Sequence, residues 1–155
     1  MTSGASTKTL CPLALADTGL RWHLRAYDRE KDRFADFALT RIVKAKALDS
    51  PIPIEEQIES DVQWARIVHI ELVPHPGIAH PKAIEADFRM NNGVLALDMR
   101  APLVGYALRR WSVDCSNDHG LDPKEHHLWL SNPQTLYGVE SADLAPGFKR
   151  TKGQA

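Results

Sequence analysis

A strictly alternating segment near the N-terminus constrains this chain most. Over residues 20–27, apolar side chains occupy every second position, and basic or hydrogen-bonding side chains fill the positions between them. The apolar row is Leu20, Trp22, Leu24 and Ala26, and the other row is Arg21, His23, Arg25 and Tyr27. A period of two is typical of a β-strand with one face packed against a core. We therefore expect the apolar row to be buried and the basic row to lie on the opposite face.

The neighbouring segments predict a small antiparallel sheet around this strand. Asp17-Thr18-Gly19 is a turn signal after the apolar run at residues 13–16, which predicts a hairpin. A charged turn at residues 29–32 precedes another strand over residues 33–39, and residues 41–47 are a candidate fourth strand. Three or four short strands with tight turns favour a small antiparallel barrel or a curled sheet.

A stretch rich in proline and acidic residues separates this block from a second one. Residues 50–65 contain Pro51 and Pro53, which interrupt strand ladders, and the stretch is typical of a linker. The second block predicts strand, helix, strand, helix and a short edge strand, over residues 67–73, 81–89, 94–99, 102–111 and 128–130. Residues 1–11 are expected to be a disordered leader, and residues 138–155 a polar tail.

Composition and charge favour a globular protein of the cytoplasm. The chain has 155 residues, of which 43% are hydrophobic, enough for one ordinary domain or two small ones. The 19 basic and 20 acidic residues nearly cancel, so any nucleic-acid contact has to come from a local basic patch. The polar N-terminus lacks the apolar run of a signal peptide or membrane anchor, and the two distant cysteines are expected to be reduced thiols.

Two blocks of the chain resemble the WYL family. Residues 19–28, with the sequence GLRWHLRAYD, and residues 37–42, with the sequence FALTRI, are similar to the core of WYL domains. Residues 70–76, 106–110 and 128–133 are similar to the extension that follows many WYL domains. The resemblance is nearest to regulators that control bacterial phage-defence operons.

This resemblance implies an α+β protein of two parts. It implies a small SH3/Sm-like antiparallel β-barrel over residues 12–49 and a small α/β, ferredoxin-like extension over residues 66–137 that forms a homodimer. WYL domains of this kind sense a nucleotide or single-stranded nucleic-acid effector, which alters DNA binding by a preceding winged helix-turn-helix domain. This chain has no room for that domain, so we expect either a fragment that begins after it or a short form that works with a partner.

The expected ligand-binding residues are cationic or aromatic side chains on or near the alternating strand. They are His23, Arg25, Tyr27, Arg33 and Arg41. Arginine binds phosphate or carboxylate through a planar fork of donors, and a tyrosine ring offers a surface on which a base can stack. His23 stands where the family's name-giving tyrosine usually stands. Ala35 replaces an arginine of many relatives, whose role Arg33 would partly take over.

Other interpretations of the same residues stay open. The basic row also fits the solvated face of a half-buried sheet, and His23 and Ala35 fit a dimerisation scaffold whose ligand pocket has degenerated. A third hypothesis is a zinc hydrolase built on Cys115, His119, His126 and His127. Their spacing lacks a second Cys-x2-Cys element, so we expect no metal and no cofactor. The sequence contains no phosphate-binding glycine motif and no hydrolase motif, which favours a sensor over an enzyme.

Overall fold

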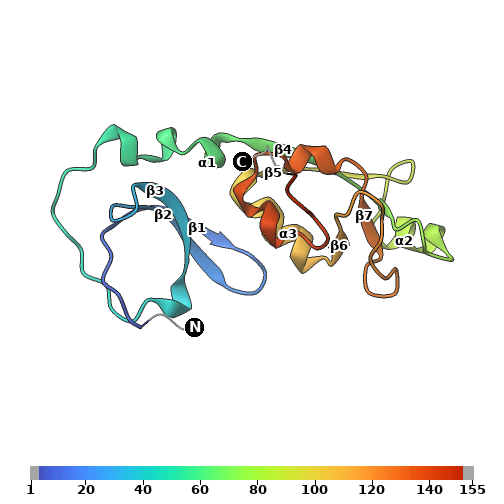
Figure 1. Ribbon diagram of the computed structural model, residues 1–155, viewed down its shortest axis with the longest axis horizontal. Helices are drawn as coiled ribbons and strands as arrows, with labels where there is room; N and C mark the ends of the chain where they lie inside the picture. The colour runs from blue at the N-terminus through green and yellow to red at the C-terminus, as the bar shows by residue number, and fades with distance from the viewer. Residues whose placement is uncertain (1–3, 152–155) are drawn as a thin grey trace. The chain divides into compact units, whose positions relative to one another are not determined.

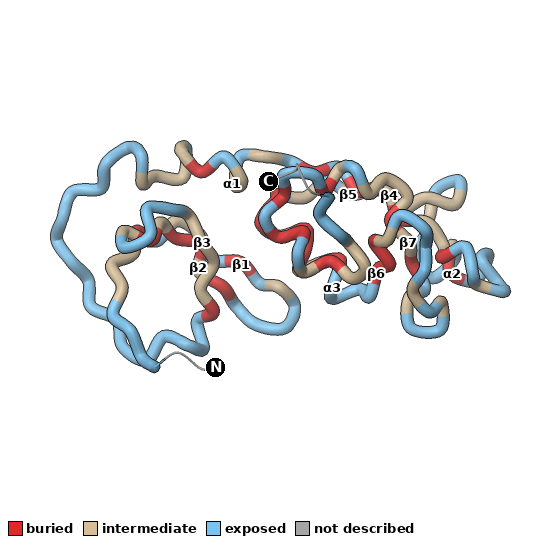
Figure 2. The backbone as a smooth tube through the Cα atoms, viewed as in Figure 1, coloured by how far each residue is buried: buried red, intermediate tan, exposed pale blue. Residues whose placement is uncertain are grey.

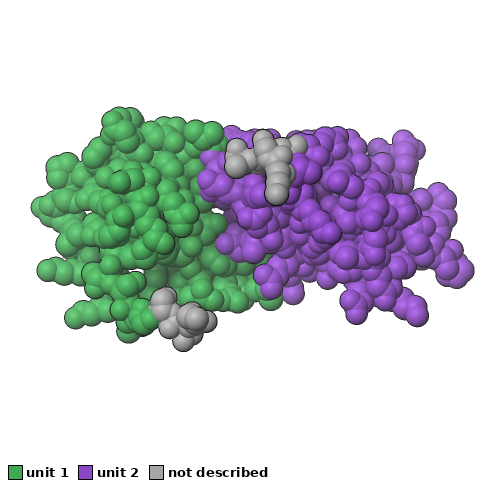
Figure 3. Space-filling model, in the orientation of Figure 1, with its two compact units in different colours: residues 1–62 green, residues 63–155 purple. Residues whose placement is uncertain are grey.

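The computed structural model describes residues 4–151, and the chain divides into two compact units. Unit 1 comprises residues 1–62 and unit 2 comprises residues 63–155 (Figures 1 and 3). Unit 1 contains a three-stranded sheet, and unit 2 contains a four-stranded sheet with helices. The expected α+β class is therefore confirmed. None of the described helices combines the length and the apolar character needed to cross a membrane.

The sheet of unit 1 is antiparallel, in the order β1-β2-β3. β1 (Leu10–Asp17) and β2 (Trp22–Asp28) form the predicted hairpin, and β3 (Arg33–Ala38) returns along β2. In the hairpin turn the Gly19 N–H donates to Asp17 Oδ1 at 2.8 Å, and the φ of Gly19 is 78°, a conformation that glycine adopts without strain.

The fourth strand that we expected over residues 41–47 is absent, and the described residues of unit 1 do not form a closed barrel. A short 3-10 turn, Leu39–Arg41, follows β3, and residues 42–53 are exposed and lack regular structure (Figure 2). Within residues 41–47, Ile42 and Val43 are the large apolar side chains, and consecutive strand residues point to opposite faces. Neither face would bury enough apolar surface to offset the loss of chain entropy.

Burial along β2 differs from the expected assignment of its two faces. His23 and Arg25 are buried, whereas Trp22 is 51% exposed and Leu24 is only half buried. The prediction that Trp22 packs in the core is therefore wrong, although Ala26 is buried as expected. Alternation defines two faces of a strand, but burial also depends on what covers each face. On this strand, carboxylates of the chain cover the face that carries Arg25.

Unit 2 has a mixed sheet in the order β5-β4-β7-β6. β4 (Ile67–Pro74), β5 (Leu95–Arg100) and β7 (Leu128–Leu130) form where three strands were predicted, and β4 pairs antiparallel with both of the others. β6 (Val113–Asp114) pairs parallel with β7. The expectation that residues 128–130 form an edge strand is wrong, because β6 covers the outer side of β7. With only two residues, β6 is too short to give a periodic signal.

Three short helices accompany this sheet: α1 (Val62–Ala65), α2 (Pro81–Asp87) and α3 (Ala101–Arg110). The order β4-α2-β5-α3-β6-β7 differs from the β-α-β-β-α-β order of ferredoxin-like folds, so that detail of the expectation is not supported. Val104 and Leu108 of α3 are fully buried in the core that this helix shares with the sheet. Their helical spacing, backed by exposed Arg109 and Arg110, is the amphipathic pattern that predicted the helix.

The segment expected as a polar tail is instead folded against α3. Glu140–Leu144 forms a 3-10 turn beside this helix, and Val139, Ala142 and Ala145 are buried. These small apolar residues are scattered among polar ones, so the segment has no clear period, yet it completes the core of unit 2. Residues 1–3 and 152–155 of the expected leader and tail lie outside the described residues.

Candidate functional site

Arg25 of β2 is enclosed by two carboxylates of its own chain. Its Nε and one Nη atom donate to the two oxygens of Asp61 at 2.7 and 3.0 Å, and its side chain is 3% exposed. The other Nη atom donates at 3.2 Å to Asp36, which lies directly opposite on β3. Burial opposes the charge, but the hydrogen bonds and charges of Asp61 and Asp36 outweigh it and raise the pKa of Arg25. The planar fork of this guanidinium is therefore charged and occupied.

Arg29, immediately after β2, makes a second contact of the same kind. Its Nε donates to Glu56 Oε2 at 2.8 Å, and one Nη atom lies 2.7 Å from the same oxygen. That Nη atom also donates to the Pro51 carbonyl oxygen at 3.0 Å. Residues 50–61, which we term the acidic segment, belong to the stretch expected as a linker. Two arginines at β2 hold this segment in the structure.

Three of the five predicted ligand residues share one face of β2. His23 and Arg25 are buried, and Tyr27 is half buried, with its ring edge-on to Phe34 at 5.0 Å between centroids. The position of this row on one strand follows from the period of two. The burial of Arg25 does not, since Asp61 of the acidic segment contacts it and lies 36 positions away along the chain.

The other two predicted residues are exposed and lie apart from each other. Arg33 begins β3 opposite Asp28, so it lies on the face opposite to that of Arg25. Arg41 ends the 3-10 turn after β3, and this turn contacts β2. Within residues 4–151, no ion pair joins Arg33 or Arg41 to a carboxylate. Both guanidinium groups are therefore accessible cations at opposite ends of β3.

Sequence reasoning missed both carboxylates at Arg25. Asp36 had a detectable signal, because pairing β2 with β3 through the charged turn places it opposite Arg25. Asp61 had none, because it lies 36 positions away in an irregular stretch with several other acidic residues.

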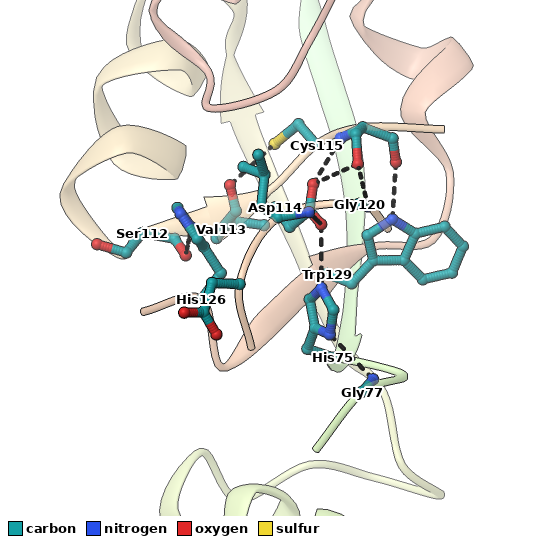
Figure 4. Close-up of polar contacts among 12 residues, drawn as sticks. His75, Gly77, Ser112, Val113, Asp114, Cys115, Gly120, His126 and Trp129 are labelled. Atoms are coloured by element: carbon teal, nitrogen blue, oxygen red, sulfur yellow. Dashed lines mark hydrogen bonds and ion pairs between the residues drawn. The ribbon is translucent and has the colours of Figure 1, made fainter. Parts of the chain in front are cut away.

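A second buried polar cluster lies in unit 2 around Asp114 at the end of β6 (Figure 4). Asp114 Oδ1 accepts the N–H and the hydroxyl of Ser116 at 2.8 and 2.7 Å. Its Oδ2 accepts the Leu121 N–H and lies 3.0 Å from His75 Nε2. The Gly77 N–H donates to His75 Nδ1 at 3.0 Å, which leaves the Nε2 proton of neutral His75 directed at Asp114. Both oxygens of the Asp114 carboxylate are therefore engaged in hydrogen bonds within the chain.

The hydrogen bonds of this cluster indicate a structural role, because they connect two loops of unit 2. Burial raises the pKa of Asp114, but the hydrogen bonds from Ser116, Leu121 and His75 outweigh burial and lower the pKa below its ordinary value. The side chains of His75 and Asp114 are 2% and 0% exposed. Asp114 therefore joins the turn after β4 to the loop after β6 from a buried position.

The cysteine and histidines considered for zinc have separate environments. The Cys115 thiol donates to the Val113 carbonyl oxygen, and burial, followed by the charge of Asp114, raises its pKa. His126 Nδ1 lies 2.7 Å from the Ser112 carbonyl oxygen, and His119 packs edge-on to Trp129. Across residues 4–151, no three His, Cys, Asp or Glu side chains are grouped closely enough to hold a metal ion.

The two units coincide with two separate family matches. A family model described as "WYL domain" matches residues 2–47, within unit 1. A second, described as "BrxR transcriptional regulator, C-terminal dimerization domain", matches residues 67–136, within unit 2. The chain therefore contains a WYL domain followed by a BrxR-type C-terminal dimerization domain. Its WYL domain provides β1, β2 and β3, and its BrxR-type domain provides the β4 sheet.

Curated relatives of the chain are named "DNA-binding transcriptional repressor CapW". The protein from Escherichia coli strain KTE188 is 33% identical over 136 residues, which is 86% of this chain and 44% of the relative. The protein from Pseudomonas aeruginosa is 38% identical over 103 residues, 65% of this chain and 33% of the relative. The protein from Stenotrophomonas maltophilia is 30% identical over 129 residues, 82% of this chain and 42% of the relative. The chain thus spans less than half of the length of each.

Proposed function

We propose that this chain is the effector-sensing and dimerising region of a bacterial transcription repressor that acts in the cytoplasm. The observation that carries the proposal is that one repressor aligns with this chain over 136 residues, through both the WYL domain and the BrxR-type domain. DNA would be bound by a helix-turn-helix domain outside the chain. The relatives carry the name of repressors rather than of enzymes, which supports a regulatory function without catalysis.

The proposed effector is anionic, either a nucleotide or a short single-stranded nucleic acid, and the WYL domain binds it. Arg33 and Arg41 are exposed cations that no described carboxylate neutralises. Arg25, Tyr27 and His23 form a row on β2, which the turn that carries Arg41 contacts, whereas Arg33 lies on the other face of the sheet. Guanidinium groups on a rigid sheet suit phosphate, and the Tyr27 ring is a candidate stacking surface for a base.

Arg41→Ala is expected to weaken binding of a fluorescently labelled oligothymidylate of about ten nucleotides by roughly tenfold at low salt. It should also reduce the salt dependence of the affinity by about one phosphate contact. Arg41 is exposed, so its loss leaves the buried pairs of Arg25 intact. Fluorescence anisotropy at about 50 and 200 mM salt measures both effects.

Arg110→Ala is the matched control, because Arg110 is an exposed arginine of unit 2 outside the proposed site. It should bind like the unmodified chain. Equal affinity for Arg41→Ala and Arg110→Ala would exclude Arg41 from the binding surface.

One observation favours a second function, that of a dimerisation scaffold without a working ligand site. The guanidinium fork of Arg25, which would be the most rigid anion ligand, is filled by Asp61. A scaffold would form dimers and leave the labelled oligothymidylate unbound at every concentration and salt. The sensing function predicts dimers that bind it.

A further inference from the structure

We propose that the acidic segment is an internal competitor of the effector, in which Asp61 and Glu56 occupy the arginines that an anionic ligand takes over. This inference rests on the proposed effector binding by the WYL domain and describes how that site is regulated. The ligand class that it requires carries phosphate or similar oxyanions, each able to accept two parallel hydrogen bonds from one guanidinium.

The contact between Arg25 and Asp61 has the geometry with which arginine binds such an anion. Two N–H groups of one guanidinium donate in parallel to two oxygens of one carboxylate, at 2.7 and 3.0 Å. Phosphate accepts the same fork with two of its oxygens. Arg29, four residues further along the chain, contacts a second carboxylate with two nitrogens, although both lie on one oxygen of Glu56, at 2.8 and 2.7 Å. The acidic segment therefore presents two anions to two neighbouring arginines, as a short stretch of nucleic-acid backbone would.

Little apolar packing holds the acidic segment on the sheet. It contains two single 3-10 turns, Ile54–Glu56 and Ile58–Ser60, neither of which includes a buried residue. Ile52 and Ile54 are 47% and 58% exposed. Its attachment therefore relies on polar contacts, and a buried ion pair contributes little net stability because desolvation of the charges offsets their attraction. The free-energy cost of replacing one anion by another at the same arginines is therefore small.

Displacement of Asp61 would also transmit ligand binding from the WYL domain to the chain that follows it. Asp61 directly precedes Val62, the residue at which unit 1 ends and α1 begins. A ligand that displaces Asp61 from Arg25 breaks the contact that holds the chain at this boundary. The connection to the BrxR-type domain is then altered without any ligand contact in that domain.

The test compares acid-to-amide variants of the full chain, with the same labelled oligothymidylate as the probe. Asp61→Asn combined with Glu56→Gln removes the two charges of the acidic segment on these arginines and leaves Asp36 on Arg25. It should tighten binding by about tenfold, if the arginines are free of the segment about a tenth of the time in the unmodified chain. Glu59→Gln is the matched control, because Glu59 lies in the same segment, is exposed and has no described contact with an arginine. It should change affinity by less than about twofold.

The outcomes separate this inference from the proposed function. Binding by the unmodified chain with equal affinities for the double variant and Glu59→Gln would overturn the competition and leave effector binding intact. Failure of the unmodified chain and of every variant to bind would overturn both. If the double variant does not fold, Glu56→Gln alone carries the comparison, with a smaller gain in affinity expected.

Hydrogen exchange on the unmodified chain provides a second readout that needs no variant. Addition of the oligothymidylate should accelerate amide exchange in residues 50–61, because the ligand releases the segment from Arg25 and Arg29. Slower exchange in these residues, or no change at saturating probe, would show that the segment stays in place and would contradict the inference.

Discussion

Gly105→Ala is expected to unfold unit 2, with a loss of at least about 3 kcal/mol in the free energy of unfolding. Gly105 lies in α3, where its N–H donates to Ser141 Oγ at 3.0 Å. A Cβ atom at Gly105 would lie 1.7 Å from the Ser141 carbonyl oxygen and 2.5 Å from its carbon. Both are backbone atoms of the 3-10 turn Glu140–Leu144, so no side-chain rotation relieves the overlap. The 3-10 turn therefore has to move away from α3 to make room for the added methyl group.

Thermal and urea unfolding followed by circular dichroism measures this loss. Gly120→Ala is the matched control, because Gly120 is exposed in the same unit and the three atoms nearest its Cβ would all belong to the Asp118 carboxyl group, the nearest at 3.0 Å. That side chain is free to rotate, so we expect a change within about 0.5 kcal/mol. A Gly105→Ala variant as stable as the control would show that the turn is not packed on α3 as described.

Asp114→Asn is expected to destabilise unit 2 by about 2–4 kcal/mol at neutral pH. Asp114 accepts hydrogen bonds with both oxygens and has no exposed surface. Asparagine replaces one of these acceptors with an amide donor. That donor then faces either the Ser116 donors or those of Leu121 and His75. Asp118→Asn, an exposed change nearby, is the control and should leave the unfolding midpoint in urea nearly unchanged.

The same variant should also remove part of the dependence of stability on pH. The pKa of Asp114 in the folded state lies below its ordinary value of 3.8, so the unfolded chain takes up the proton first as the pH falls. The stabilisation is complete above about pH 5 and is lost as the pH falls through 3.8 and below. Unfolding midpoints of the two proteins should therefore converge on acidification. A gap that stays constant down to about pH 3 would contradict this role of Asp114.

Local periodicity predicted most strands and helices, but it did not predict what covers them. The alternation of β2 and the amphipathic spacing of α3 are local patterns, and both elements formed where expected. The exposure of Trp22 was not predictable in this way, because it depends on which face of the sheet the rest of the chain covers. β6 and the 3-10 turn at residues 140–144 were missed because they are too short or too irregular to show a period.

The candidate site was predicted as a set of residue types rather than as an arrangement. His23, Arg25 and Tyr27 share a face because of the strand period, which sequence alone specifies. The engagement of Arg25 by Asp61 depends on a contact between residues 36 positions apart, which no local pattern encodes. The same limit applies to His75 and Asp114, which lie 39 positions apart along the chain and meet only in the fold.

Sedimentation velocity with the labelled oligothymidylate tests most directly whether one chain both dimerises and senses an anion. We predict that the label travels with a species of twice the 17.3 kDa chain mass, at low salt, and that the protein stays dimeric when added salt releases the label. Protein that sediments at the mass of a single chain, with the label remaining free, would contradict both parts of the account.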